Sequence, residues 1–254
     1  VDGNFFLVAL AASGWELWRS NGTDAGTTLV RNITPDAGDS SPLTPVFTQN
    51  GVFFSAKTAS EGRELWRSDA TTVGTSIAED ILPGTGDGLR EGFSPLFDLD
   101  GTVFFPAQGP SLGRELWKSD GTAAGTNIVK DISPGSATTS FKPFTNYNGT
   151  LVFNASEPTG GEELWKADGT ADGTVRIRDI VPGPTSSYPG GFSGTEPLMA
   201  VANDILVFAT FISNEGMEPW RSDGTEGGTT ILEDIVAGFD AAISQMAATG
   251  GRVF

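Results

Sequence analysis

Carboxylates and aromatic rings in the loops are the residues of this sequence that could do binding chemistry. Four aspartates recur at related places in the long connections, where grouped carboxylate oxygens could hold calcium: Asp36, Asp39, Asp87 and Asp240. Known calcium loops space their ligands closely, as in D-x-D-x-D, and these connections contain no such run. We therefore expect solvated aspartates and no cofactor, with calcium binding as the alternative.

Sugar binding is the second chemistry that the loops could support. Flat rings can stack on pyranose faces, while charged side chains form hydrogen bonds with the hydroxyl groups. The candidate residues are Asp39, Asp87, Arg90, Glu91, Phe93, Phe141, Tyr188 and Phe192. Packing of these rings within their own loops is the alternative reading.

Catalysis has weaker support. A glycosidase needs two or three acids that face each other, and the segments expected to be innermost offer only Asp98 and Asp100, with Glu196 nearby. Asp100 belongs to an Asp-Gly turn, which explains it without catalysis. The absence of His removes the commonest general base and most zinc, copper and iron sites. We expect a protein that is not an enzyme, with a glycoside hydrolase as the less favoured alternative.

The charge and hydropathy of the chain disfavour some classes of binding partner. The formal net charge of -17 repels nucleic acid and anionic lipid headgroups. The longest apolar run, residues 5–12, is far shorter than the roughly 20 residues that a membrane-spanning helix needs. We expect neither nucleic acid binding nor membrane insertion. The chain starts at Val1 without a signal peptide, and we interpret it as processed or trimmed.

A seven-residue phrase occurs five times and indicates the elements that carry these loops. Its copies are ELWRSNG from Glu16, ELWRSDA from Glu64, ELWKSDG from Glu115, ELWKADG from Glu163 and EPWRSDG from Glu218. Successive motif tryptophans are 48, 51, 48 and 55 residues apart. A period of about 50 residues is typical of a propeller or a solenoid.

Each repeat is predicted to form four short strands. In the second repeat these are Pro45–Gln49, Val52–Ala56, Arg63–Ser68 and Thr75–Ile81, with a hairpin turn at Asn50-Gly51. Four strands per repeat predict an all-β fold, a five-bladed β-propeller of four-stranded antiparallel blades. We expect a single domain over residues 1–254. Its blades are expected at about 34–81, 82–132, 133–180 and 181–235, with 1–33 plus 241–254 forming one further blade.

Ring closure is expected to join the two ends of the sequence. Residues 1–33 supply only the second, third and fourth strands of a blade, and Ile243–Thr249 resembles the missing first strand. We expect this C-terminal strand to pair with the N-terminal blade, because closure removes open sheet edges. Arg252–Phe254 is redundant with the start of that blade, and we interpret it as a remnant of a longer array or a strand that swaps into a neighbour.

The repeated phrase itself is interpreted as scaffold. Leu65 and Trp66 point to opposite faces of their strand, so each can pack against a different blade, and Trp suits core packing. Asp-Gly-Thr is turn chemistry, and Ala70 in the glycine position predicts a strained or different turn. The repeated Glu is expected to be buried, with an ion pair favoured over backbone partners.

These copies resemble the bacterial ELWxxDGT-repeat family, with departures at Asn21, Ala70 and Pro219. The resemblance covers the whole chain and all five repeats. It implies a bacterial protein that is secreted or lies on the cell surface, and it offers no catalytic residues to carry over.

The function is expected to lie in the long connections, because variable loops on a rigid scaffold usually carry binding. The two tight turns of each repeat should lie at one face and the long connections at the other. We expect a non-catalytic extracellular binding module, lectin-like or adhesive, for a glycan or a surface protein. The alternative is a structural subunit that assembles with itself or within a larger extracellular or cell-surface complex.

Overall fold

The computed structural model describes residues 3, 5–35, 38–92, 95–191, 198–212, 216–236 and 241–254. The chain divides into two compact units, Val1–Ser136 and Ala137–Phe254, which are described separately below. None of the described residues forms a helix that is long and apolar enough to cross a membrane.

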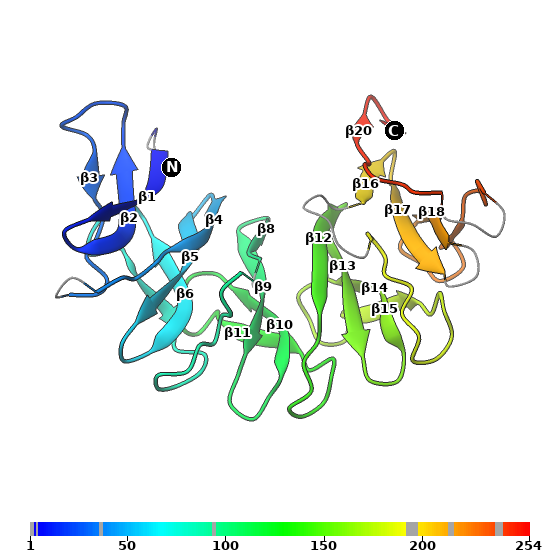
Figure 1. Ribbon diagram of the computed structural model, residues 1–254, viewed down its shortest axis with the longest axis horizontal. Coiled ribbons are helices and arrows are strands. Elements are labelled where there is room, and N and C mark those ends of the chain that lie inside the picture. Colours follow the sequence, from blue (N-terminus) through cyan, green and yellow to red (C-terminus); the bar gives the residue numbers. More distant parts are fainter. Residues whose placement is uncertain are drawn as a thin grey trace. The chain divides into compact units, whose positions relative to one another are not determined.

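Unit 1 consists of three antiparallel sheets, each with its strands side by side in chain order (Figure 1). We call each sheet a blade. Blade A contains β1 (Phe5–Ala11), β2 (Gly14–Ser20) and β3 (Thr28–Leu29). Blade B contains β4 (Leu43–Thr48), β5 (Gly51–Thr58), β6 (Gly62–Ser68) and β7 (Ser76–Glu79). Blade C contains β8 (Phe97–Leu99), β9 (Thr102–Gln108), β10 (Arg114–Ser119) and β11 (Asn127–Lys130).

Unit 2 repeats the same pattern in two further blades. Blade D contains β12 (Phe141–Tyr147), β13 (Thr150–Glu157), β14 (Gly161–Ala167) and β15 (Val175–Arg178). Blade E contains β16 (Met199–Ala202), β17 (Ile205–Ile212), β18 (Gly216–Ser222) and β19 (Thr230–Ile231). A final hairpin joins β20 (Ala248–Thr249) to β21 (Arg252–Val253). The predicted all-β architecture with four short strands per repeat is confirmed.

The pairing register is the same in every repeat. Val52 is opposite Ser68 in blade B, and Phe5 takes the same place opposite Ser20 in blade A. Blade A therefore supplies the second, third and fourth strand positions, as predicted. In blades B, C and D the register shifts at the motif Leu-Trp pair, so that a bulge bends the outermost strand at the same point.

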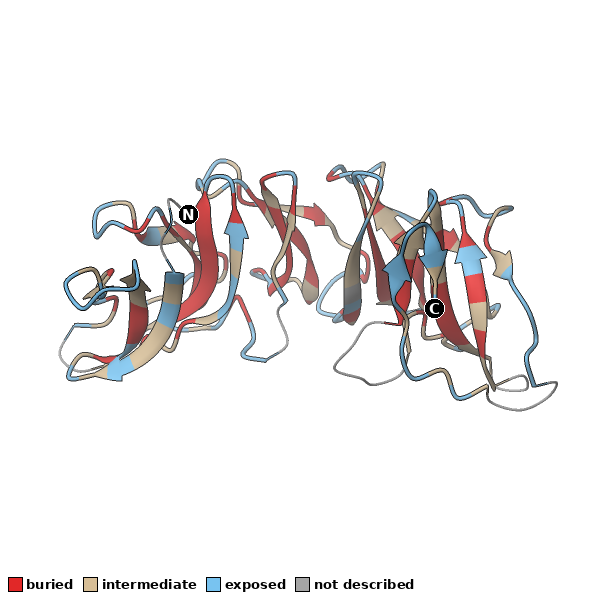
Figure 2. Cartoon of the chain, turned by 90° about the horizontal axis from the view of Figure 1, so that it is seen from above, coloured by how far each residue is buried: buried red, intermediate tan, exposed pale blue. Residues whose placement is uncertain are grey.

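The core lies between neighbouring blades. Trp66 is 6% exposed and packs with Leu17 and Val30 of blade A. Leu65, the preceding residue, is fully buried with Val103 and Trp117 of blade C. The prediction that these two side chains contact different blades is confirmed, and so is the core role of the motif tryptophan. Figure 2 shows the resulting buried stretches in red along the strands.

The C-terminal residues form a hairpin of their own, and closure of the ring between the two ends of the chain stays a prediction. Ala248 and Thr249 pair with Val253 and Arg252 of the same hairpin, and in the described residues blade A is a three-stranded sheet. Gly250 and Gly251 have φ angles of 56° and 76°. Two successive positive φ angles are those of a tight hairpin turn, which folds the predicted closing strand back onto the residues that follow it.

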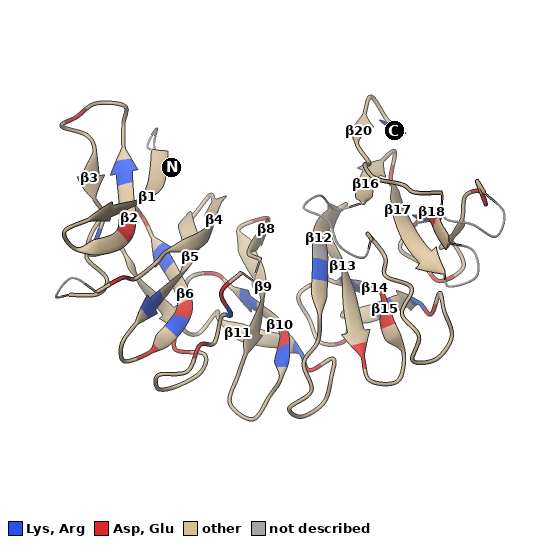
Figure 3. Cartoon of the chain, viewed as in Figure 1, with Lys and Arg blue, Asp and Glu red and all other residues tan. Residues whose placement is uncertain are grey.

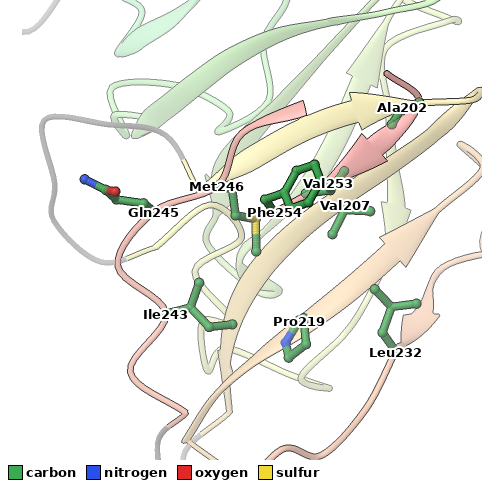
Figure 4. Close-up of a pocket in the computed structure, with 10 residues that line it drawn as sticks. Ala202, Val207, Pro219, Leu232, Ile243, Gln245, Met246, Val253 and Phe254 are labelled. Carbon is green, nitrogen blue, oxygen red and sulfur yellow. The ribbon is translucent and has the colours of Figure 1, made fainter. Parts of the chain in front are cut away.

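An apolar groove of about 420 Å³ lies in unit 2 between blade E and this C-terminal segment (Figure 4). Val207, Pro219 and Leu232 line its blade E side. They occupy the positions of Phe53, Leu65 and Ala78, which in blade B pack against the following blade. The groove is therefore the face of blade E that corresponds to an interface between blades.

Candidate binding site on the loop edges of the blades

In blades A, B and D a side chain of the long connection accepts a hydrogen bond from the backbone beside a hairpin turn of that blade. Asp87 Oδ1 accepts a hydrogen bond of 2.8 Å from the backbone N–H of Arg63, and Asp39 Oδ1 accepts one of 2.9 Å from that of Trp15. Ser186 Oγ takes the same role in blade D, at 3.0 Å from the N–H of Glu162. Asp39 and Asp87, predicted as ligand or calcium residues, therefore each hold a loop in place.

The motif glutamate is the second fastening of these loops. The Glu64 carboxylate is fully buried and accepts backbone N–H groups of Ile81 at 3.1 Å, Leu82 at 3.3 Å and Gly88 at 2.9 Å. The predicted ion pair is therefore wrong for Glu64, because backbone donors meet its need for partners. A Cβ on Gly88 would lie 2.5 Å from the carboxylate oxygens, so this contact requires glycine.

The same fastening recurs in every repeat. Each motif glutamate accepts the N–H of the isoleucine 17 residues further on: the pairs are Glu16–Ile33, Glu64–Ile81, Glu115–Ile132, Glu163–Ile180 and Glu218–Ile235. Burial raises the pKa of Glu64 to about 8 and that of Glu163 to about 7, although the N–H donors oppose this shift.

Two positions beside this contact vary among the blades, and their combination is different in each blade. The residue before the motif glutamate is Trp15, Arg63, Arg114, Glu162 or Met217. The second-strand residue opposite the motif leucine or proline is Val8, Ser55, Pro106, Asn154 or Ala209. Both lie on the strand face that carries the motif leucine, because they are two residues apart from it or directly opposite. The scaffold thus presents a different pair of side chains beside the long connection of each blade, at what we call the loop edge of the blade.

In blade B the pair is Arg63 and Ser55. The Arg63 guanidinium is 2% exposed and donates to the carbonyl of Ser41 at 2.9 Å. Its Nη2 lies 3.7 Å from Oε2 of Glu91, a side chain that is 71% exposed. Burial lowers the pKa of Arg63, and Glu91 and Asp87 oppose that shift. The buried arginine thus orients two of the predicted ligand residues, Asp87 through its backbone and Glu91 through its charge.

In blade D the pair is Glu162 and Asn154, with Lys142 beside them. Lys142 is directly opposite Asn154 across β12 and β13, and it is the only basic residue of β12, visible as the blue band in Figure 3. Asn154 is fully buried and donates through Nδ2 to the carbonyl of Pro189 at 3.1 Å. A cation, an amide and a carboxylate therefore share one face.

The remaining predicted residues have separate positions. Arg90 is exposed on the connection between blades B and C. Burial lowers the pKa of Arg114, and the positive charge of Arg90 lowers it further. Phe141 is 4% exposed and packs on Phe144 and Phe153. For Phe141 the structure therefore shows packing, the alternative to ligand contact. Tyr188 is half-buried. The residues that lie outside the described part of the chain are Asp36, Phe93, Phe192 and Asp240.

The acidic residues considered for metal binding and catalysis are not grouped into a site among the described residues. No three acidic side chains come together to hold a metal among the described residues. Asp98 Oδ1 accepts the N–H of Gly101 at 3.1 Å, and Asp100 has φ 52° in that turn, so both serve a hairpin. Glu196 lies outside the described residues.

Sequence reasoning missed Arg63, Lys142, Asn154 and Glu162. The signal was present in the repeat itself. Alignment of the five copies shows nearly constant Glu, Leu and Trp beside a preceding position that is Trp, Arg, Arg, Glu or Met, and variable positions on a repeated scaffold are where individual blades can differ in binding.

No protein-family model matches the sequence, and no curated protein is significantly similar to it. Among solved structures, the chain is similar to puromycin hydrolase, with a TM-score of 0.51 at 14% identity over 99% of this chain and 41% of that one. It is also similar to TolB from Acinetobacter baumannii, with a TM-score of 0.45 at 12% identity over 90% of this chain and 52% of that one. The chain thus spans about two fifths to one half of the length of these proteins.

The blade topology and the likeness to puromycin hydrolase define the class: this is an all-β protein with the β-propeller fold. At 14% identity the likeness concerns the fold alone.

Proposed function

We propose that the protein is a non-catalytic extracellular binding module that binds glycans through the loop edges of its blades. The observation that carries this proposal is the pair of side chains that changes in every blade beside a fastening that does not change. A scaffold that repeats its fold but varies its loop-edge chemistry is suited to binding.

The chemistry of these edges supports a polar ligand. Arg63 with Glu91 in blade B, and Lys142 with Glu162 in blade D, place both signs of charge next to each other. Hydroxyl groups donate and accept, so they can satisfy such mixed sets, whereas an apolar ligand would leave them unpaired. The resemblance of the phrase to the ELWxxDGT-repeat family is consistent with a secreted or cell-surface bacterial protein, and this location is part of the proposal.

A glycan array probed with the fluorescently labelled protein tests the proposal. We expect selective signal for one class of sugar, unchanged by a calcium chelator if the loop aspartates only fasten loops. Loss of the signal in chelator would instead support the calcium alternative for Asp39 and Asp87. A blank array in both buffers would contradict glycan binding.

A structural subunit is the second candidate function, and the apolar groove on blade E favours it. Leu232 is 46% exposed there, on a face whose counterparts in unit 1 are buried between blades. Light scattering after size-exclusion chromatography, on the wild type and on Leu232→Arg, tests this candidate. Association that the substitution abolishes would support assembly through the groove, and a monomer at high concentration would contradict it.

A further inference from the structure

The loop edge of blade D contains a buried polar atom without a partner. Asn154 is 0% exposed, and its Nδ2 donates to the carbonyl of Pro189, which fixes the orientation of the amide. The other end of the amide, Oδ1, has no hydrogen-bond partner. A buried acceptor that lacks a donor is costly, and such atoms are rare in folded proteins. Asn154 thus marks a hydrogen-bond network that is incomplete.

Two charged side chains lie next to this amide on the same strand face. Lys142 is the cross-strand neighbour of Asn154, where Cβ atoms are about 4.5–5.5 Å apart. Glu162 is the diagonal neighbour, two residues before Leu164, which is opposite Asn154. Burial raises the pKa of Glu162, while the Asn154 amide and the Lys142 charge oppose that shift. The three side chains therefore form one interacting group.

The connection that follows blade D holds this group in place. Ser186 Oγ accepts the N–H of Glu162, and the N–H of Ser187 donates to the Glu162 carbonyl at 3.0 Å. Tyr188, the next residue, has φ 51°, a left-handed conformation that is strained for a bulky side chain. Such strain persists where the surroundings enforce it, and it is common at ligand sites. Tyr188, the predicted aromatic residue, thus directly follows the two serines that bond the backbone of Glu162.

The donor and acceptor capacities of this group select the ligand. The free Asn154 oxygen requires a donor, the Glu162 carboxylate accepts, and the Lys142 ammonium only donates. An anionic ligand would face Glu162 and a cationic ligand would face Lys142, so each would meet a like charge. A neutral molecule with neighbouring hydroxyl groups meets all three requirements, because each hydroxyl both donates and accepts.

We propose that Lys142, Asn154 and Glu162 form a binding site for a neutral sugar, with vicinal hydroxyl groups bound between the ammonium and the carboxylate. Because Asn154 Oδ1 is buried, one bridging water connects it to the sugar, and Tyr188 offers its ring to the sugar face. This proposal rests on the proposed function and names the blade that performs it. The other described blades lack the set: blade B has Leu43, Ser55 and Arg63 at the corresponding positions.

The test is a titration of the ¹⁵N-labelled protein with methyl glycosides of glucose, galactose, mannose and N-acetylglucosamine, followed by NMR. We expect shift changes at residues 142, 154, 162 and 186–190. Lys142→Ala and Glu162→Gln should each weaken binding about tenfold or more, which is typical of the loss of a hydrogen bond to a charged group. Asp172→Asn, which removes an exposed carboxylate in the turn between β14 and β15 of the same blade, is the matched control and should bind like the wild type.

The outcomes separate this site from the general function. Shift changes that map to another blade, or variants that bind like the wild type, would overturn the site and leave glycan binding intact. No shift with any glycoside, together with a blank array, would overturn both. If Glu162→Gln does not fold, Lys142→Ala decides, because Lys142 is exposed and its removal leaves the core unchanged.

Discussion

The ammonium group of Lys166 in blade D donates a hydrogen bond of 2.8 Å to the carbonyl oxygen of Gly224 in the Asp-Gly-Thr turn of blade E. Arg67 of blade B lies in the same way against Gly121 of blade C, where a Cβ on the glycine would come within 2.3 Å of Arg67 Cδ. The basic residue of one phrase thus rests on the turn of the next. This contact explains why both are part of one repeated phrase.

Lys166→Met should loosen the contact between blades D and E. We expect the free energy of unfolding to fall by about 1 kcal/mol, the usual net value of one hydrogen bond. Arg221→Met is the matched control, since Arg221 has the same motif position in blade E and is exposed. Urea denaturation of both variants measures the difference, and an equal loss in both would contradict the interblade role.

Ala70→Gly should stabilise the protein. Ala70 has φ 74°, in a position that is glycine in the other four copies of the phrase. A left-handed conformation costs a residue with a Cβ about 1 kcal/mol or more relative to glycine. We expect thermal unfolding to shift upward by a few degrees. The predicted strain at this turn would be contradicted by an unchanged or lower melting temperature.

Gly74→Ala should be strongly destabilising although its φ angle is ordinary. A Cβ there would lie 2.0 Å from the Asp69 carboxylate, which accepts the N–H of Thr71 at 2.9 Å and so shapes the turn. We expect a loss of more than about 1 kcal/mol, comparable to the loss of a helix cap or a buried hydrogen bond. Gly227→Ala, where a Cβ would meet nothing within 4 Å, is the control and should change stability little when both are compared in urea.

Stability should fall as the pH rises from about 5 to about 8. The folded-state pKa of Glu64, about 8, and that of Glu163, about 7, lie above the ordinary value of 4.5, so the folded protein holds these protons more tightly. The contribution of these two groups to the free energy of unfolding is complete below the ordinary pKa, and it is lost as the pH rises through the raised pKa values. The slope is at most about 1.4 kcal/mol per pH unit for each group.

Glu64→Gln separates this effect from other titrations. Glutamine cannot ionise, so the free energy of unfolding of this variant should depend less on pH than that of the wild type, when urea titrations are compared across this range. Glu91→Gln, which removes an exposed carboxylate from the adjacent loop, is the control. Equal pH profiles for Glu64→Gln and the wild type would show that Glu64 is ionised throughout.

The sequence by itself determined the blades. Strand positions follow from alternation and turn residues within about ten positions, and the phrase repeats the same local signals, so the burial of Trp66 and the turn at Asp69 could be predicted. The partners of Glu64 could not, because Ile81 and Gly88 reach it only after a whole strand and its connection have folded back.

Only the tertiary structure decided the chemistry of the loop edges and of the C-terminal strand. Lys142, Asn154 and Glu162 come from three strands, and cross-strand register rather than sequence distance places them on one face. Ala248 and Thr249 have the pattern of a first strand, and the two glycines that follow let them pair with Val253 and Arg252. A local hairpin closes with a small loss of chain entropy, because the loop between its two strands is short.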